Sequence, residues 1–193
     1  MSSNLASPTK SPHFLADRPG VIPSQAIRRM LEAGAITVTA PVAPDQVQPA
    51  SLDLRLGPTA WRVRASFLPG AAPLAERLAE FEMHRIDLGP GAVLEKGCVY
   101  VVPLMEGLDL PPDVSAVANA KSSTGRLDLF TRLITDRAAE FDRIAPGYRG
   151  PLYAEISPRS FSVLARPGMR LNQIRFRRGD ATLDDQALAA LDA

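Results

Sequence analysis

Residues 119–156 read NAKSSTGRLDLFTRLITDRAAEFDRIAPGYRGPLYAEI, a stretch in which short strand-like runs alternate with polar clusters. The first cluster spans residues 121–126. The second, residues 147–150, is a turn that leads into the apolar-rich run 151–156. Glu155 lies inside that run. Because a buried carboxylate is costly unless another group pairs with it or the protein uses it, Glu155 is a candidate functional acid.

The first cluster, KSSTGR, places two cations, three hydroxyls and a glycine in six positions. Lys121 and Arg126 can contact phosphate oxygens, and Ser122, Ser123 and backbone N–H groups can complete the shell. An exposed polar turn is the plain alternative for this cluster, and a cross-strand ion pair is the plain alternative for Glu155. Together, an anion-binding loop and an acid in one segment indicate a phosphorylated substrate and a proton-transfer step.

Outside this stretch, the chain is a series of short alternating runs separated by glycine and proline. Leu52, Leu54 and Leu56 alternate with polar residues inside the segment 48–57, which predicts a strand with one face inward. The 18 prolines favour sheet edges and turns. Further strands are predicted at 36–39, 60–65, 83–86, 92–94, 98–104, 113–118, 127–133, 161–165 and 171–176. The predicted fold is mainly β, an antiparallel sandwich, jelly roll or barrel.

Helices are predicted to be few and short. The segment 22–34 has a helical apolar face, with Ser24 placed to cap its start and Gly34 placed to end it. A second short helix is predicted at 74–78. Asp53, in the strand 48–57, is interpreted as a partner for Arg55 or for backbone groups, although a functional carboxylate stays open.

The length of 193 residues suits one sizeable domain. Residues 1–14 are rich in serine and proline and are interpreted as a disordered leader. Residues 15–179 form the predicted domain. Residues 180–193 become helical in composition and are interpreted as a linker or the start of a further element, which suggests a piece of a longer chain.

Composition excludes several classes of function. The net charge of +1 provides no basic field for nucleic acid or for a membrane surface, and no run is long enough to span a bilayer. The single cysteine, Cys98, excludes an intramolecular disulfide framework and favours a reducing cytoplasm. We therefore expect a cytoplasmic protein with neither nucleic acid nor a membrane as partner.

Zinc chemistry and several other mechanisms lack the residues they need. His13, His84 and Cys98 have no ligand spacing, and the shortage of histidine also disfavours a Ser–His nucleophile. No G-x-x-x-x-G-K-[ST] loop occurs. Carboxylate acid–base chemistry on a phosphorylated ligand remains, with no metal site expected in the protein itself.

Five motifs occur in a fixed order along the chain: QPASLDLRLG, KSSTGR, RIAPGYRG, YAEI and RPGMRLNQIRF. In this order they resemble the dCTP deaminase branch of the dUTPase-like superfamily over residues 22–178, and most closely the N-terminal half of its tandem-duplicated form. The resemblance implies a distorted jelly roll of the β-clip type. It also implies a homotrimer or pseudo-trimer with active sites between subunits. The implied reaction converts dCTP and water to dUTP and ammonia, with Mg²⁺ bound to the triphosphate and without zinc.

The resemblance also implies roles for individual residues. The general acid–base glutamate of the family falls on Glu155, and the serine and arginine that position water and nucleotide fall on Ser122 and Arg126. We expect Arg126 to orient Glu155. The phosphate-binding position falls on Lys121, where arginine is more usual. Further substrate-binding positions fall on Ser123, Thr124, Gly125, Ala145, Tyr153, Ala154 and Gln173.

Two departures from the family pattern bear on the activity. Ala145 stands where the family has an aspartate, which in dUTPases activates the hydrolytic water and in deaminases helps to hold the nucleotide. Residues 181–193 contain no Lys, Arg or Tyr that could close over a triphosphate. A dUTP diphosphatase of the same fold, weakened by Ala145, and a non-catalytic nucleotide-binding half of a tandem deaminase are the alternative functions.

Overall fold

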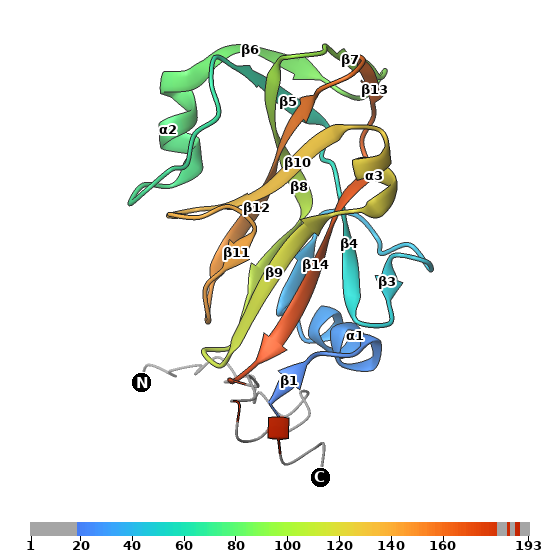
Figure 1. The fold of residues 1–193 in the computed structure, drawn as a ribbon, viewed down its shortest axis with the longest axis vertical. Helices are drawn as coiled ribbons and strands as arrows, with labels where there is room; N and C mark the ends of the chain where they lie inside the picture. Colours follow the sequence, from blue (N-terminus) through green and yellow to red (C-terminus); the bar gives the residue numbers. More distant parts are fainter. Residues whose placement is uncertain (1–18, 181–184, 186–187, 190–193) are drawn as a thin grey trace, which may run out of the picture.

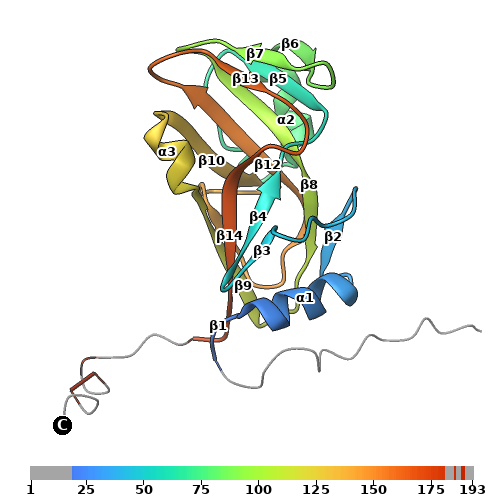
Figure 2. The same ribbon diagram turned by 90° about the vertical axis from the view of Figure 1, so that its right-hand side faces the viewer.

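The computed structural model describes residues 19–180 and positions 185, 188 and 189. The predicted leader, 1–14, and most of the predicted linker lie outside this part of the chain. The described chain is mainly β, with two six-stranded antiparallel sheets and one two-stranded sheet (Figures 1 and 2). The predicted fold class, mainly β with few short helices, is confirmed.

The first six-stranded sheet carries both ends of the described domain. Its strands pair in the order β11-β9-β14-β4-β3, and β1 pairs with β14. Their bounds are β1 (Gly20–Val21), β3 (Val47–Gln48), β4 (Ser51–Arg55), β9 (Val114–Ala120), β11 (Arg143–Ile144) and β14 (Arg170–Arg178).

The second six-stranded sheet holds the strand that contains Glu155. Its strands pair in the order β10-β12-β8-β5-β6, and β2 pairs with β8. Their bounds are β2 (Ile36–Val38), β5 (Thr59–Val63), β6 (Glu82–Asp87), β8 (Val99–Asp109), β10 (Leu129–Thr135) and β12 (Arg149–Pro158). A small sheet of β7 (Ala92–Leu94) and β13 (Val163–Ala165) lies at the end of the domain opposite β1 (Figure 1).

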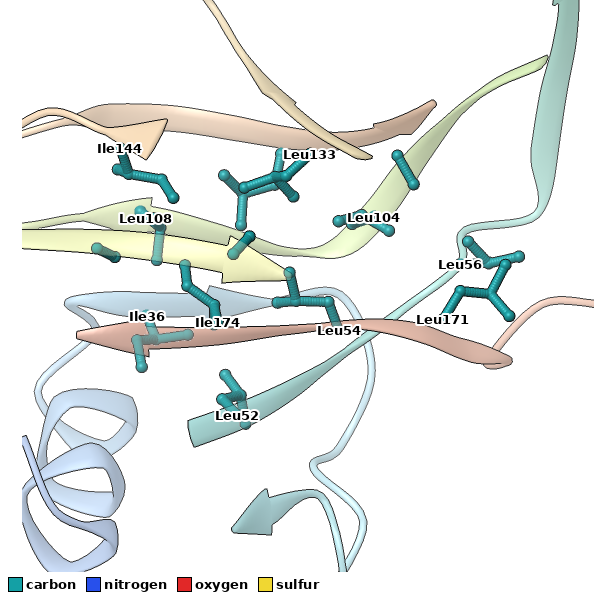
Figure 3. Packing of buried hydrophobic residues seen from close by; sticks show 14 of the residues in the cluster. Ile36, Leu52, Leu54, Leu56, Leu104, Leu108, Leu133, Ile144, Leu171 and Ile174 are labelled. Carbon is teal, nitrogen blue, oxygen red and sulfur yellow. The ribbon is translucent and has the colours of Figure 1, made fainter. Parts of the chain in front are cut away.

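The main core lies between the two large sheets. Leu54 and Ile174 of the first sheet gather with Leu104, Leu108 and Leu133 of the second in one buried cluster (Figure 3). Each leucine or isoleucine buried in this way contributes about 1.5–3 kcal/mol. The leucines of β4 face this core, which explains why apolar and polar residues alternate there as predicted.

A smaller cluster covers the other face of the second sheet. Helix α2 (Leu74–Phe81) and the segment before it bring Phe67, Leu74 and Leu78 against Val101 and Tyr153. The ring of Phe67 stacks on that of Phe81, with 4.3 Å between centroids. Cross-strand neighbours share a face of a sheet, and Glu155 pairs in register with Val101. Glu155 therefore lies on the face that this cluster covers.

Helix α1 (Ser24–Glu32) ends as predicted but starts differently. Gly34 follows it with φ +76°, a conformation that favours glycine. The predicted cap, Ser24, is instead the first helical residue, and Pro23 occupies the N-cap position without a side-chain cap. Proline has no N–H and a fixed φ, so it can precede a helix at little cost.

The KSSTGR cluster is not the loop that we predicted. Helix α3 (Ser122–Arg126) forms a single helical turn there. Thr124 is buried, and its hydroxyl donates to the carbonyl oxygen of Leu171 at 3.0 Å. This contact with β14 anchors the turn against the first sheet.

Candidate active site

Glu155 sits in the middle of β12, with β10 on one side and β8 on the other. It is 1% exposed. A side chain on a central strand, paired on both sides, is held by a rigid scaffold. Such a scaffold can hold a functional side chain in a precise position.

Arg132, directly opposite Glu155 on β10, holds one oxygen of the carboxylate. Its Nε and Nη2 both donate to Glu155 Oε1, at 3.1 and 2.5 Å. Glu155 Oε2 is buried and has no hydrogen-bond partner among the described residues. The predicted orienting group, Arg126, makes no such bond within residues 19–180. The alternation of β10 puts residue 132 on the face of Glu155, whereas Arg126 belongs to α3.

The α3 turn presents its other polar groups outward. Ser122, Ser123 and Arg126 are exposed, and their side chains make no hydrogen bond or ion pair within the described part of the chain. Gly125 lies about one helical turn after Lys121, whose carbonyl oxygen accepts its N–H at 3.0 Å. The hydroxyls and the guanidinium are therefore available to a ligand or to another chain.

Lys121 precedes α3 and points to a buried carboxylate. Its Nζ forms an ion pair with Asp53 Oδ2, and Arg170 Nη1 lies 3.9 Å from the same oxygen. Asp53 Oδ1 is buried without a partner in residues 19–180. The predicted partner of Asp53, Arg55, pairs instead with Glu106 at 2.8 Å. Two cations thus gather around one carboxylate beside the α3 turn.

Gln173 lies on β14 opposite Asp53 of β4 and Asn119 of β9. Ser51 Oγ donates to Gln173 Oε1 at 3.3 Å. The Lys121 N–H donates to the carbonyl of Leu171 in the same strand at 2.8 Å. The pairing of β9 with β14 therefore brings Lys121 close to Gln173, and both residues are expected to bind substrate.

Arg170 extends this charged group to the surface. Its Nη2 donates to Asp45 Oδ1 at 2.8 Å. That hydrogen bond lowers the pKa of the exposed Asp45 carboxyl and raises the pKa of the Arg170 guanidinium. The Arg170–Asp45 pair is therefore ionised over the whole physiological pH range.

Ala145 lines a cavity of about 570 Å³ between β9, β11 and the residues that follow β10. Four arginines line the same cavity: Arg137, Arg143, Arg149 and Arg177. Tyr148 also lines it, and burial raises the pKa of the Tyr148 hydroxyl to about 12, so this group stays a neutral donor. The hydroxyl donates to the carbonyl of Pro151 at 2.7 Å. The cavity is a basic, partly open site of the size that small-molecule ligands need.

Besides Thr124, two of the predicted substrate-binding residues, both on β12, are buried in packing. Tyr153 belongs to the smaller cluster, and burial raises the pKa of its hydroxyl to about 12. Ala154 faces the main core. Only the backbone of Ala154 could meet a ligand, because its side chain is fully buried.

These parts remain apart within one chain. No hydrogen bond or ion pair joins Glu155 to the α3 turn within residues 19–180, and neither lines the cavity at Ala145. No group of three or more His, Cys, Asp or Glu side chains that could hold a metal occurs in the described part of the chain. Among the same residues, no helix is long and apolar enough to cross a membrane.

Comparisons with known proteins give the family. The 2'-deoxycytidine 5'-triphosphate deaminase (DCD) N-terminal domain family matches residues 18–180. The chain is 31% identical over 154 residues to dCTP deaminase of Natronomonas pharaonis. The matched region covers 78% of this chain and 76% of that protein. The chain is 29% identical over 151 residues to a protein of Coprothermobacter proteolyticus named dCTP deaminase, dUMP-forming, with 78% and 77% of the two chains covered.

A solved structure agrees with these matches. The structure is similar to that of 2'-deoxycytidine 5'-triphosphate deaminase from Agrobacterium tumefaciens, with 55% identity and a TM-score of 0.84. That likeness covers 90% of this chain and 52% of the other, so the chain spans about half the length of that structure. The resemblance in the order of the motifs is thereby confirmed at the level of the family. The chain belongs to the dCTP deaminase N-terminal domain family.

Proposed function

We propose that this chain carries the catalytic acid–base of a dCTP deaminase, which converts dCTP and water to dUTP and ammonia. The observation that carries the proposal is Glu155 in a chain of this family. Its carboxylate is buried on a central strand, with Oε1 held by an arginine and Oε2 without a partner in residues 19–180.

A carboxylate with one free oxygen can perform the proton transfers of this reaction. Cytosine C4 is a weak electrophile, so the attacking water must lose a proton as it adds. Glu155 Oε2 would take that proton and deliver it to N3, then take the second proton from the hydroxyl now bonded to C4 and deliver it to the leaving amine. Atoms balance, because the water oxygen becomes the carbonyl of uracil and the amine leaves as ammonia.

Substrate binding is assigned to the two basic regions. Lys121, with Ser122, Ser123 and Arg126 of the α3 turn, would contact the triphosphate and position the water. The cavity at Ala145 supplies further cationic groups. Mg²⁺ would arrive with the triphosphate, as part of the substrate, and would require no ligands from the protein.

The site would be completed by a second copy or by a second half. The support is that the α3 turn and Glu155 are not joined in one chain, although both belong to the proposed site. A homotrimer, or a pseudo-trimer of tandem halves, would bring one chain's turn to another's glutamate. The tandem form is supported by the solved relative, of which this chain covers 52%.

The alternative function, dUTP diphosphatase, is weakened by Ala145. A methyl group cannot activate a water for attack on phosphorus, and the cavity that Ala145 lines contains its acidic groups on Asp136 and Glu140 instead. Glu140 is already paired with Arg143 at 3.0 Å, and Asp136 Oδ1 accepts the N–H of Leu74 at 2.8 Å. A non-catalytic nucleotide-binding half is the other alternative.

The test is incubation of the chain with dCTP, CTP or dUTP and Mg²⁺, with ammonia and pyrophosphate both measured. We expect ammonia from dCTP and no pyrophosphate from dUTP. Pyrophosphate from dUTP without ammonia would indicate a diphosphatase, and binding of dCTP without product would indicate a non-catalytic half.

A zinc-selective chelator should change nothing, whereas EDTA should abolish nucleotide binding. Light scattering on the same sample should show a trimer, and a monomer at micromolar concentration would contradict the homotrimer.

A further inference from the structure

We propose that Arg132 is a positioning residue for Glu155. It fixes Oε1 so that Oε2 is the single oxygen available for proton exchange. An aromatic clamp, formed by Phe130 and Phe141 together with Ser66, fixes Arg132 in turn. The proposal rests on the proposed function in taking Glu155 as the acid–base. It adds a residue and a supporting segment that neither the sequence motifs nor the family description includes.

The hydrogen bonds between Arg132 and Glu155 are arranged in an unusual way. An arginine commonly meets a carboxylate with two parallel bonds, one to each oxygen. Here both donors, Nε at 3.1 Å and Nη2 at 2.5 Å, go to Oε1. Oε2 is thereby left buried and without a partner in the described part of the chain. A purely structural ion pair gains nothing from leaving an acceptor unmatched, because a buried unsatisfied oxygen destabilises the fold.

The guanidinium of Arg132 is held from three sides. Its Cζ lies 3.5 Å from the ring centroid of Phe141 and 4.9 Å from that of Phe130. Nη2 also donates to Ser66 Oγ at 2.8 Å. Aromatic faces attract a cation and restrict its plane. The orientation of Arg132 is therefore set by groups outside the ion pair.

The clamp joins two segments that are distant in sequence. Phe141 belongs to the residues between β10 and β11, and Ser66 belongs to the segment before α2. Backbone bonds lock these two segments together: the Arg137 N–H donates to the carbonyl of Ala72 at 3.1 Å, and the Gly70 N–H donates to that of Ala138 at 3.1 Å. The segment between β5 and α2 thus has a role, because it helps to fix the guanidinium group that orients Glu155.

The test compares Arg132→Lys and Arg132→Ala with a matched control, Arg62→Gln. Arg62 pairs with Glu95 at 2.9 Å, and its side chain is 29% exposed against 25% for Arg132. Lysine keeps the charge but cannot place two fixed donors on one oxygen. We expect Arg132→Lys to lower kcat for ammonia release about 10²-fold with little change in KM, because misplacing a reacting group by about 1 Å costs that much. Arg62→Gln should leave both constants unchanged.

Chemical rescue separates positioning from folding. Arg132→Ala should lose more activity than Arg132→Lys, and added guanidinium ion should restore part of kcat by occupying the space between the rings. Phe141→Leu, which removes the ring but keeps an apolar side chain, should lower kcat less than either. Loss that follows Tm across these variants and does not respond to guanidinium would overturn the proposal, as would wild-type kcat in Arg132→Lys. A change in KM alone would instead make Arg132 a substrate contact.

A readout without substrate keeps this inference distinct from the proposed function. In protein labelled with [¹³C]glutamate, the Glu155 carboxyl signal can be assigned by its loss in Glu155→Gln. That signal should shift in Arg132→Lys and in Phe141→Leu but not in Arg62→Gln. Absence of ammonia from the wild type would count against the deaminase function alone, whereas an unchanged Glu155 signal in both clamp variants would count against the role of Arg132.

Discussion

Two arginine–glutamate pairs with a buried glutamate occur among residues 19–180, and they differ in how many of their polar atoms are hydrogen-bonded. In the Arg55–Glu106 pair both carboxylate oxygens are bonded: Oε1 accepts from Arg55 Nε and Gln46 Nε2 at 2.8 Å each, and Oε2 accepts the Arg55 N–H at 2.7 Å. The remaining guanidinium nitrogens donate to the carbonyls of Pro41 and Ala40 at 2.6 and 2.9 Å. In the Arg132–Glu155 pair, one oxygen takes both bonds and the other takes none from the described residues.

The difference is the one expected between a structural pair and the acid–base pair that we propose. The Arg55–Glu106 pair ties β4 of the first sheet to β8 of the second, and its side chains are 8% and 0% exposed. A closed network of this kind specifies one packing of the sheets and has no capacity to accept a proton or a water. The Arg132–Glu155 pair retains a free acceptor on a rigid strand. Unsatisfied buried polar atoms are uncommon in native proteins, and this one leaves an acceptor for the proton transfer that we propose.

The largest effect that would test this comparison is expected for Glu155→Gln. Glutamine keeps the size and one acceptor oxygen, so the bonds from Arg132 can persist and dCTP binding should survive. It cannot accept the water proton, so deamination should fall by about 10²–10⁴-fold, toward the upper end because one group serves several transfers. Ammonia release and calorimetric binding of dCTP measure the two effects. Near wild-type turnover would make Glu155 a structural strand carboxylate.

The reverse pattern is expected for Glu106→Gln. The variant leaves the charge of Arg55 buried and turns an NH₂ group toward other donors, so the free energy of unfolding should fall by about 3–5 kcal/mol. Glu155→Gln should cost only about 1–2 kcal/mol, since Arg132 keeps a hydrogen bond and is partly hydrated. Urea unfolding of the two variants in parallel measures the contrast. Equal losses from both would remove the distinction between the pairs.

Local patterns predicted much of the fold. The strand predicted at residues 92–94 is β7 without change, and Gly34 ends α1 as expected. Both depend on information within a few residues, namely alternation in the first case and a positive φ in the second. The helix predicted at 74–78 extends to Phe81, because packing of Phe81 on Phe67 continues it.

Long-range pairing limited the prediction of the site. Arg126 belongs to one of the recognised motifs, but strand register brings Arg132 to Glu155 across 23 residues of sequence. The sequence contained a weak signal for this pair. The apolar run 129–135 contains one cation, Arg132, and the apolar run 151–156 contains one anion, Glu155. Asp53 and Arg55 share a strand face, yet Arg55 turns to Glu106 and Asp53 to Lys121. These choices depend on which strands meet, which composition does not determine.

The smallest expected effect concerns a third carboxylate, Asp142, which lies close to the Arg132–Glu155 pair. Asp142 Oδ1 accepts the N–H of Leu133 at 2.7 Å. Burial raises the pKa of the Asp142 carboxyl above its ordinary value of 3.8, although the hydrogen bond from Leu133 and the charge of Arg132 oppose that change. A pKa raised by folding means that the folded chain keeps a proton where the unfolded chain has lost it. Stability therefore decreases as the pH rises through 3.8 toward the raised value, and the full loss is present above it.

Asp142→Asn removes the charge but keeps the acceptor and the backbone shape. Asparagine tolerates the positive φ of 63° at this position. We therefore expect the variant to have a slightly higher Tm than the wild type at neutral pH and the same Tm below pH 3.8, where the wild-type carboxyl is also neutral. Scanning calorimetry at both pH values measures the difference. A lower Tm of the variant at neutral pH, with equality in acid, would show that attraction to Arg132 outweighs burial. The charge of Arg132 would then be shared between two carboxylates rather than committed to Glu155.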